Sequence, residues 1–413
     1  MPLEVAFYSD ALTSGRYGLG RYAHELLRAL CQAVPEIKVR PISAHVAEHQ
    51  AERLITHPVD ACVQVPFARR IIAALWSTIG RPQLERWTPW ADMVHSVELD
   101  YRVATRKPWV VTIHDIGPLT HPEFFRKSHP WLLKVALKAA VDRAAAIICV
   151  SRATAEAVED YAKCRLGDRL AVIPEGVSEE FFKGGMRSAE CEMISESAIR
   201  NTSSNIPHSA VCNPYFLWAG SLNPRKNLAR VIDAFEQVAP EVPHHLVLTG
   251  GSGWDSEKTL ARIRSSPLAA RIHLCGHVSD EDLRALYHGA SGFLYVSLME
   301  GFGLPILEAM ACGCPVITSN LSSMPEVAGD AAFLVNPLDT CEIAEAIHCV
   351  ATDSVFARGL SARGRARAEE FHWDSCALAV AEIYQRVAQD RLIPKAQPGE
   401  KVDGEPTELK PAA

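Results

Sequence analysis

Short apolar runs alternate with amphipathic helical stretches along most of the chain, and this alternation limits the possible folds more than any other feature. In the first half the apolar runs are residues 3–9, 37–43, 93–97, 109–114 and 146–151. In the second half they are residues 215–220, 245–250, 271–276, 292–297, 315–319 and 332–335. Strands that alternate with helices pair in parallel, and helices cover both faces of such a sheet. The sequence therefore predicts an α/β protein.

The alternation stops once, at residues 183–210, which are polar and lack an apolar period. A chain of 413 residues is also too long for one ordinary hydrophobic core. We expect an N-terminal Rossmann-like domain over residues 1–182, a polar linker or insertion over 183–210 and a second Rossmann-like domain over 211–371. A helix at 372–392 is expected to pack back on the N-terminal domain, and the polar end at 393–413 is expected to be disordered.

Composition excludes several classes of protein. The formal net charge of −7 argues against non-specific binding of nucleic acid, which needs a basic surface. The 12 cysteines form no CxxC pair, and the close pair Cys312 and Cys314 is expected to pack in a helix rather than bind metal. There is no basic leader and no run of about 18 apolar residues. The sequence therefore predicts a cytoplasmic protein.

Two glutamates stand eight residues apart, just after the apolar run at 292–297. Gly301 and Gly303 allow a tight turn that could approach a ligand, and Pro305 suits the start of a helix. Glu300 is then expected on a loop at the carboxyl edge of a sheet, and Glu308 in the first helical turn, facing a cleft. The alternative makes Glu300 a solvated loop acid and Glu308 a partner of the helix dipole.

Two adjacent cations, Arg225 and Lys226, follow the apolar run that ends at Gly220 and Ser221. A pair of cations on a loop suits a diphosphate, which needs positive charge from more than one direction. Asn227 is placed to cap the next helix. The alternative is a pair of solvated surface charges.

In the first half, glycines 15, 18 and 20 are expected to form a loop between a strand and a helix. The spacing is not GxGxxG, so this signal alone is weak. His114 ends the run 109–114, again at a carboxyl edge, where it could contact a substrate. The alternative is a hydrogen bond to neighbouring backbone.

These segments together resemble the retaining glycosyltransferases of family 4, whose GT-B architecture has two facing Rossmann-like domains with a ligand cleft between them. The most specific segment is "EGFGLPILE" at 300–308. It is supported by "GSLNPRKN" at 220–227, "TIHD" at 112–115 and "GLGRYAHEL" at 18–26. The resemblance extends over residues 3–390 apart from 183–210.

The resemblance implies a role for each matching residue. Glu300 would contact the hydroxyls of the donor sugar, and Glu308 those of the ribose. Arg225 and Lys226 would hold the diphosphate, and His114 would contact the sugar near the reacting centre. The expected catalytic residues are His114, Glu300, Arg225 and Lys226. The other implied donor-binding residues are Gly301, Phe302, Gly303 and Leu304 by their backbone, the loop residues Gly18, Gly20, Gly220 and Ser221, and Val278 beside the base.

The sequence departs from the family at Glu175, where the family usually has asparagine. We expect this change to affect the loop between the domains more than the chemistry. The resemblance implies front-face substitution with retention, in which an oxygen of the leaving diphosphate takes the acceptor proton. It implies no metal and no cofactor, because the two cations would neutralise the diphosphate.

The "TIHD" and "GLGRYAHEL" segments look most like bacterial mannosyltransferases of surface-polysaccharide assembly. The favoured donor is therefore GDP-mannose, and the expected acceptor is a saccharide or a polyprenol-linked saccharide. UDP-glucose as donor, a nucleotide-sugar epimerase and a non-catalytic nucleotide-sugar-binding protein remain alternatives. An NAD-dependent dehydrogenase is disfavoured, because no GxGxxG follows the first strand.

The segment 66–87 could bring the enzyme to a membrane. Its apolar residues Phe67, Ile71, Leu75 and Ile79 recur every four residues, with Ile72 and Trp76 alongside and Arg69, Arg70, Arg81 and Arg86 at the flanks. An apolar face with basic flanks can lie on an anionic bilayer. The alternative is a helix that packs on its own sheet.

Overall fold

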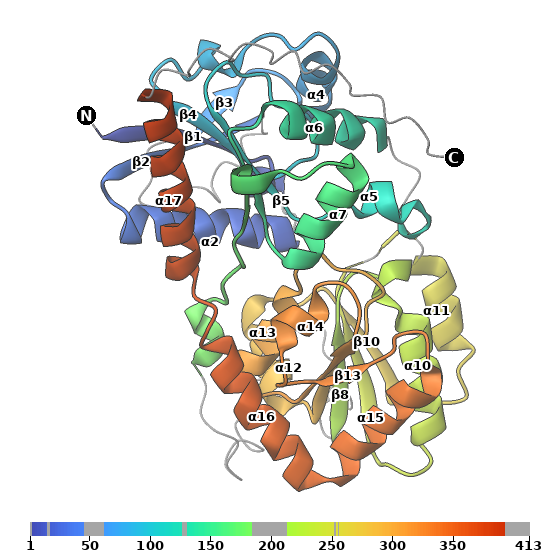
Figure 1. Ribbon diagram of the computed structural model, residues 1–413. Helices are drawn as coiled ribbons and strands as arrows, with labels where there is room; N and C mark the ends of the chain where they lie inside the picture. Colours follow the sequence, from blue (N-terminus) through green and yellow to red (C-terminus); the bar gives the residue numbers. More distant parts are fainter. Residues whose placement is uncertain are drawn as a thin grey trace, which may run out of the picture.

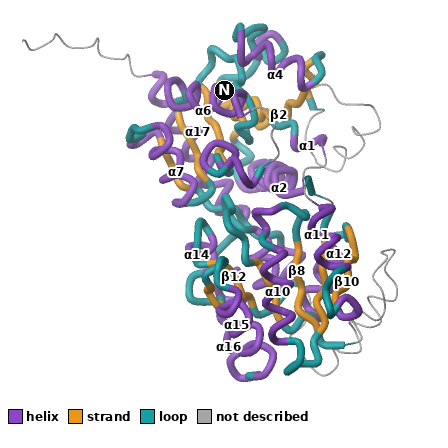
Figure 2. The backbone as a smooth tube through the Cα atoms, turned by 90° about the vertical axis from the view of Figure 1, so that its right-hand side faces the viewer, coloured by secondary structure: helices purple, strands orange, loops and turns teal. Residues whose placement is uncertain are grey.

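The computed structural model describes residues 2–14, 17–44, 62–125, 130–183, 213–251, 253–254 and 256–392. Apart from Lys183, the expected linker at 183–210 lies outside these ranges, and so does the expected disordered end at 393–413. The domain boundaries therefore stay predictions. The described residues form two lobes, one above the other in Figure 1 and again separate in the side view of Figure 2.

The N-terminal lobe is built on a seven-stranded parallel sheet with the order β3-β2-β1-β4-β5-β6-β7. Its strands are β1 (Leu3–Tyr8), β2 (Ile37–Ala44), β3 (Val63–Val65), β4 (Met93–Ser96), β5 (Trp109–Ile113), β6 (Ala146–Cys149) and β7 (Leu170–Val172). Its helices are α1 (Ala11–Ser14), α2 (Tyr17–Ala33), α4 (Arg69–Thr78), α5 (Gly117–Thr120), α6 (Pro130–Arg143) and α7 (Arg152–Ala162). The strand order reverses between β1 and β4.

The C-terminal lobe has a six-stranded parallel sheet with the order β10-β9-β8-β11-β12-β13. Its strands are β8 (Tyr215–Ala219), β9 (His245–Thr249), β10 (Ile272–Gly276), β11 (Gly292–Tyr295), β12 (Val316–Ser319) and β13 (Phe333–Val335). The helices are α10 (Leu228–Val238), α11 (Ser256–Arg264), α12 (Asp280–Gly289), α13 (Leu304–Ala311), α14 (Met324–Ala328), α15 (Thr340–Thr352) and α16 (Ser354–Ala368). The last helix, α17 (Trp373–Leu392), returns to the N-terminal lobe. Ligands of such sheets bind outside the strand ends where the order reverses, here between β8 and β11.

Continuous burial explains why the central strands were recognisable. Every residue of β5 and of β8 is buried, as expected for strands with helices on both faces. Two strands were not predicted, β3 and β7, which have three residues each and lie at the two edges of the sheet. Both include partly exposed residues, so their apolar signal is short and weak. The α/β class and the two parallel sheets are confirmed.

The last helix, α17, packs against α2 of the N-terminal lobe, which it crosses in Figure 1. Its Tyr384 hydroxyl lies 2.6 Å from Nδ1 of the buried His95 on β4. One continuous hydrophobic cluster joins α2, α17 and the inner face of the C-terminal sheet. It includes Cys312 and Cys314, which are buried as predicted. The two lobes therefore share part of their core.

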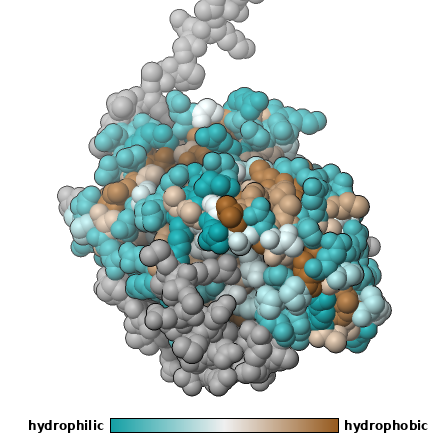
Figure 3. Space-filling model, turned by 90° about the horizontal axis from the view of Figure 1, so that it is seen from below, coloured by the Kyte–Doolittle hydropathy of each residue, from teal (hydrophilic) through white to brown (hydrophobic). Residues whose placement is uncertain are grey.

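Helix α4 exposes less apolar surface than the sequence suggested. Ile72 and Trp76 are fully buried, and Trp76 Nε1 donates a hydrogen bond to the Pro82 carbonyl at 2.6 Å. These two side chains therefore belong to the core, whereas Ile71 and Ile79 are 53% and 66% exposed. Among the described helices, none combines the length and the apolar character needed to cross a bilayer. The face at the end of the C-terminal lobe is mostly hydrophilic, with scattered apolar side chains (Figure 3), as is usual for a folded surface.

Candidate active site

Glu300, Arg225 and Lys226 meet at the point where the C-terminal sheet reverses its order. Arg225 and Lys226 lie in the short 3-10 helix that follows β8, and Glu300 follows the neighbouring strand β11. Glu300 Oε2 lies 2.5 Å from Arg225 Nη1, and Oε1 lies 2.7 Å from Lys226 Nζ. Lys226 also donates to the Tyr295 hydroxyl at 2.6 Å. Glu300 and Lys226 are each 7% exposed, so the alternative of solvated charges is wrong for both.

The charges of this cluster hold one another in the ionised state. Burial alone would raise the pKa of Glu300, but Arg225 and Lys226 outweigh it and lower that pKa to about 2. Burial lowers the pKa of Lys226 to about 8, although Glu300 opposes the shift. Glu300 is therefore an anion at neutral pH that neutralises two cations. Any anionic ligand of these cations must compete with Glu300.

The glycines after Glu300 serve two different purposes. Gly303 has φ +119°, a conformation that favours glycine, at the entry to α13. A Cβ on Gly301 would lie 2.0 Å from the carbonyl oxygen of His114, in the other lobe. The close approach that requires glycine here is therefore made by the protein's own backbone, and the expected contact of Gly301 with the donor stays a prediction. Ser151 donates to the Gly301 carbonyl at 2.6 Å and fixes this contact between the lobes.

Glu308 lies in the second turn of α13, because the helix already begins at Leu304; the expectation of the first turn was wrong. Its carboxylate is buried and faces the N-terminal lobe. Oε1 lies 3.0 Å from Nη1 of Arg21 on α2, and Oε2 lies 3.5 Å from the Tyr287 hydroxyl. Burial raises the pKa of Glu308, and Arg21 opposes this shift. The alternative, a partner of the helix dipole, does not fit these contacts.

Both ring nitrogens of His114 are bonded within the protein. Nε2 lies 3.0 Å from the Val97 carbonyl oxygen, and Nδ1 lies 3.1 Å from Glu175 Oε1. A carbonyl oxygen can only accept, so Nε2 must carry a proton. Burial opposes protonation of the ring, but the hydrogen bond and charge of Glu175 raise the pKa of His114. Both ring nitrogens thus have partners within the protein, and the expected contact of His114 with the sugar stays a prediction.

Glu175, where the family usually has asparagine, contacts a predicted site residue. Glu175 lies in the loop between the domains, as expected, but its carboxylate also touches His114 and is 6% exposed, so the change reaches the site as well. Glu175 lies on the segment that follows β7, where the chain leaves the N-terminal lobe. Gly176 fixes that path, since a Cβ there would lie 2.4 Å from the Trp373 amide nitrogen.

The expected glycine loop near the N-terminus is largely helical. Gly18 and Gly20 lie in the first turn of α2, which begins at Tyr17, and α1 already occupies residues 11–14. A Cβ on Gly20 would lie 3.3 Å from the Ala11 carbonyl oxygen, so Gly20 allows α2 to pack closely on α1. A Cβ on Gly18 would meet nothing within 4 Å. The predicted loop over the phosphates is therefore not formed by these two residues.

The remaining predicted residues surround the cluster of Glu300. Gly220 and Ser221 follow β8, and a Cβ on Gly220 would stand 3.5 Å from the Lys226 side chain. Phe302 is buried just before α13, Leu304 is buried as the first residue of α13, and Val278 is buried just before α12. The side chain of Asn227 does not cap α10 but donates to the carbonyls of Val296 and Pro337, at 3.0 and 2.7 Å.

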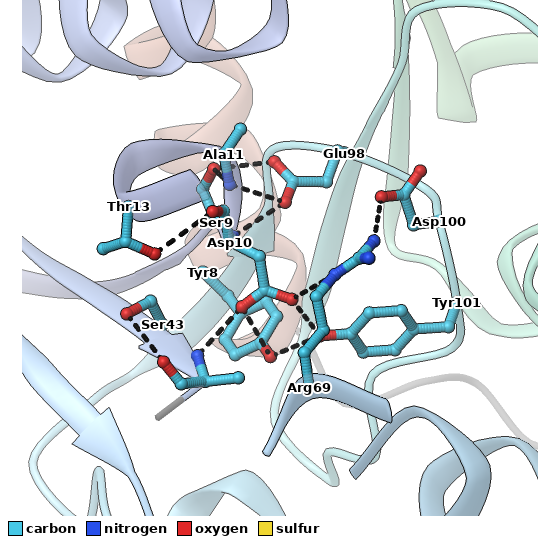
Figure 4. Close-up of polar contacts among 11 residues, drawn as sticks. Tyr8, Ser9, Asp10, Ala11, Thr13, Ser43, Arg69, Glu98, Asp100 and Tyr101 are labelled. Carbon is cyan, nitrogen blue, oxygen red and sulfur yellow. Dashed lines mark hydrogen bonds and ion pairs between the residues drawn. The ribbon is translucent and has the colours of Figure 1, made fainter. Parts of the chain in front are cut away.

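A second polar group lies at the carboxyl ends of β1 and β4, and we name it the acid–arginine cluster (Figure 4). It consists of Tyr8, Ser9, Asp10, Arg69, Glu98, Asp100 and Tyr101. Asp10 is bonded to Arg69 Nε at 3.0 Å and to the Ala44 amide at 2.9 Å. Arg69 also pairs with Asp100, and the two side chains are 38% and 31% exposed. The cluster thus reaches from the core to the surface.

The acid–arginine cluster is joined to the candidate site through Glu98. This residue directly follows Val97, whose carbonyl oxygen accepts from His114. Glu98 accepts from the Ser9 hydroxyl at 2.6 Å and from the Asp10 amide at 2.7 Å. Burial raises its pKa to about 7, and Asp100 adds to the shift. Sequence reasoning missed this cluster because its members share no motif. The available signal was that Asp10 and Glu98 each follow the end of a strand.

Two family models match the chain, and together they match more than half of it. The model described as "Glycosyltransferase Family 4" matches residues 17–181, and "Glycosyl transferases group 1" matches residues 213–353. The chain belongs to glycosyltransferase family 4. The family 4 resemblance inferred from the sequence is thereby confirmed, and this family 4 protein is a glycosyltransferase.

Similar proteins include bacterial mannosyltransferases. The O-antigen chain mannosyltransferase B of Escherichia coli is 27% identical over 413 residues, covering 93% of this chain and 100% of that protein. The serotype-specific mannosyltransferase WbdA of Escherichia coli is 31% identical over 306 residues, which cover 72% of this chain. The same match covers 36% of WbdA, so the chain spans about a third of that relative.

Solved structures confirm the fold of this family 4 transferase. Anabaena Alr3699/HepE, solved with UDP and glucose, superposes with a TM-score of 0.70 at 19% identity, covering 93% of this chain and 100% of that one. WaaG, a glycosyltransferase involved in lipopolysaccharide biosynthesis, gives a TM-score of 0.67 at 16% identity, with coverage of 92% and 99%. The predicted GT-B architecture is therefore confirmed.

Proposed function

We propose that this glycosyltransferase moves mannose from GDP-mannose to a saccharide or lipid-linked saccharide, with retention of the anomeric configuration. The observation that carries the proposal is the buried contact of Glu300 with both Arg225 and Lys226, at 2.5 and 2.7 Å. The names of the two Escherichia coli relatives support mannose as the sugar. GDP as its carrier rests on the sequence resemblance.

Donor binding is proposed to exchange one anion for another. The diphosphate displaces the Glu300 carboxylate from Arg225 and Lys226, so the two cations stay neutralised in a site that excludes most water. Glu300 is then free to accept hydrogen bonds from the hydroxyls of the donor sugar. Glu308 accepts from the ribose hydroxyls at the other end of the nucleotide. Glu300 therefore occupies the diphosphate site until the donor arrives.

The chemical step is proposed to take place on one face of the sugar. The bond between the anomeric carbon and the diphosphate oxygen breaks, and the acceptor oxygen forms the new bond on the same face. The acceptor proton passes to the leaving diphosphate oxygen. Arg225 and Lys226 stabilise the negative charge that develops on the leaving group. No separate cofactor is required, because the two cations supply the charge.

His114 is proposed to shape the sugar site rather than to exchange protons. Its ring is held between the Val97 carbonyl and Glu175, and the Tyr22 ring stands edge-on with centroids 4.5 Å apart. Its backbone carbonyl meets Gly301, which adjoins Glu300. The ring therefore fixes the loop of the N-terminal lobe against the loop that carries Glu300.

The acceptor is proposed to approach from the side of the acid–arginine cluster, where Arg69 and Asp100 reach the surface. Carboxylate and guanidinium groups bind sugar hydroxyls well. The exposed Ile71 and Ile79 on and just after α4, near Arg70 and Arg81, are proposed to contact an anionic membrane. Liposome flotation tests this contact: Ile71→Ser plus Ile79→Ser should weaken binding to anionic vesicles, and unchanged binding would exclude it.

Product analysis tests the proposed reaction. The protein is incubated with GDP-mannose or UDP-glucose, with and without an acceptor extract, and nucleoside diphosphate and saccharide products are quantified. Acceptor-dependent release of GDP with transfer of mannose is expected. Transfer from UDP-glucose but not from GDP-mannose would show that UDP-glucose is the donor. Conversion of the donor sugar without an acceptor would indicate an epimerase. Binding without turnover of any sugar nucleotide would indicate a binding protein.

A further inference from the structure

Arg21, on α2 of the N-terminal lobe, reaches across to the C-terminal lobe. Its Nη1 lies 3.0 Å from Glu308 Oε1, and its Nη2 lies 2.5 Å from Asp280 Oδ1 at the start of α12. The guanidinium also stands 5.3 Å from the centre of the Phe181 ring. Arg21 is part of the "GLGRYAHEL" segment, but the family resemblance gave it no role. Three contacts therefore fix this one side chain at the boundary of the lobes.

Glu308 depends on this cation for its charge. The carboxylate is 5% exposed, and burial disfavours the ionised form of a carboxyl group. The titratable groups that face it are Asp280 and Tyr287 of α12, Tyr295 of β11, Cys312 at the end of its own helix and Glu175 of the chain crossing. These groups are neutral or acidic, so they add no positive charge beside Glu308. Arg21 supplies it.

The Glu308 carboxylate has more acceptor positions than its contacts with Arg21 and Tyr287 use. A carboxylate offers about four acceptor positions, two on each oxygen. Arg21 occupies one position on Oε1, and the Tyr287 hydroxyl stands near one on Oε2. One position therefore remains on each oxygen, which matches the two adjacent hydroxyls of a ribose.

We propose that Arg21 is a positioning residue for the donor: it keeps the Glu308 carboxylate ionised and oriented, so that the N-terminal lobe completes a ribose site of the C-terminal lobe. This inference rests on the proposed function, in which Glu308 accepts from the ribose. A donor bound at Glu308 then favours the arrangement in which the lobes are closed around Arg21. Binding of the nucleotide and contact between the lobes are coupled through this one guanidinium.

The test compares GDP with its 2′,3′-dideoxy analogue by titration calorimetry at pH 6.0 and pH 8.5. The variants are Arg21→Met, the charge-conserving Arg21→Lys and the control Arg28→Met. Arg28 lies two turns further along α2 and pairs with Glu25 rather than Glu308. Ionisation of the phosphates affects both ligands alike, so the ratio of their affinities reports on the ribose contact alone. Thermal melting verifies that each variant is folded.

The wild type should prefer GDP over the dideoxy analogue by about tenfold or more at both pH values, since hydrogen bonds to a charged group are strong. Arg21→Met should lose more of this preference at pH 6.0 than at pH 8.5, because loss of the cation raises the pKa of Glu308 further and the lower pH favours the protonated form. Arg21→Lys should keep a measurable preference at both values, and Arg28→Met should match the wild type.

Three results would overturn the inference. Arg21→Met could keep the full preference at both pH values, or lose affinity for both ligands equally, which would mark a structural role. It could also bind GDP more tightly than the wild type, which would show that Arg21 obstructs the site. A wild type that binds neither GDP nor UDP would instead refute the proposed function, and with it the ribose contact.

Discussion

Replacing Glu300 by glutamine removes the anion that neutralises Arg225 and Lys226 in the unliganded protein. The three groups are in contact at 2.5 and 2.7 Å, and Glu300 is 7% exposed. Removal of one partner from a buried ion pair costs about 3–5 kcal/mol, because the remaining charge is left uncompensated. For a lobe of this size, about 3 kcal/mol lowers the melting temperature by about 6–12 °C.

A bound diphosphate restores the missing negative charge, so part of this loss should return as affinity. If about 1.4 kcal/mol returns, Glu300→Gln binds GDP about tenfold more tightly than the wild type. Transfer of the sugar should nevertheless fall sharply, because the contact with the sugar hydroxyls is weakened. The variant therefore combines a less stable empty protein, a larger stabilisation by GDP and low turnover.

Differential scanning calorimetry with and without GDP measures the first two effects, and product formation measures the third. Glu236→Gln is the matched control, because Glu236 also pairs with an arginine, at 2.6 Å, in the same lobe but away from the site. Its response to GDP should equal that of the wild type. If Glu300→Gln abolishes GDP binding, Glu300 does not stand in for the diphosphate.

Three further predictions concern Lys226 and the C-terminal helix. Lys226→Ala should lower kcat/KM by about 30- to 1,000-fold and weaken GDP binding, since a charge-assisted contact is worth about 2–4 kcal/mol in the transition state; unchanged steady-state kinetics would contradict its role. Because the pKa of Lys226 is about 8 and its cation binds the diphosphate, GDP affinity should fall as the pH rises above 8; calorimetry should show that Lys226→Arg removes this fall, and a fall that persists would assign it to another group. Tyr384→Phe leaves buried His95 without its hydroxyl partner at 2.6 Å, which should cost about 1–3 kcal/mol in the free energy of unfolding; denaturant titration measures this cost, and an unchanged midpoint would show that the bond adds no stability.

The sequence was sufficient to bring Glu300, Arg225 and Lys226 together, for a simple physical reason. Each follows an apolar strand, and the ends of neighbouring parallel strands meet at one edge of the sheet. The contact needs no knowledge of side-chain conformation. The α/β class follows from the same alternation of strands and helices, since the fully buried strands carry a continuous apolar signal.

Contacts between the lobes could not be predicted in this way. Arg21 reaches Glu308 because the two lobes face each other, and no local pattern encodes that placement. His114 reaches Glu175 within the N-terminal lobe, across 61 positions of the chain, which local patterns do not reveal either. Gly20 misled the prediction for another reason. Glycine is about 1 kcal/mol less favourable than alanine inside a helix, but in the first turn of α2 it allows close packing, because a Cβ on Gly20 would lie 3.3 Å from the Ala11 carbonyl oxygen. Tertiary packing outweighed local preference at this position.

The most direct test of the central claim is a crystal structure of the protein with GDP bound. The account predicts the diphosphate in contact with Arg225 and Lys226, the ribose hydroxyls on Glu308, and Glu300 released from both cations. A diphosphate bound elsewhere, with Glu300 still paired to Arg225 and Lys226, would contradict it.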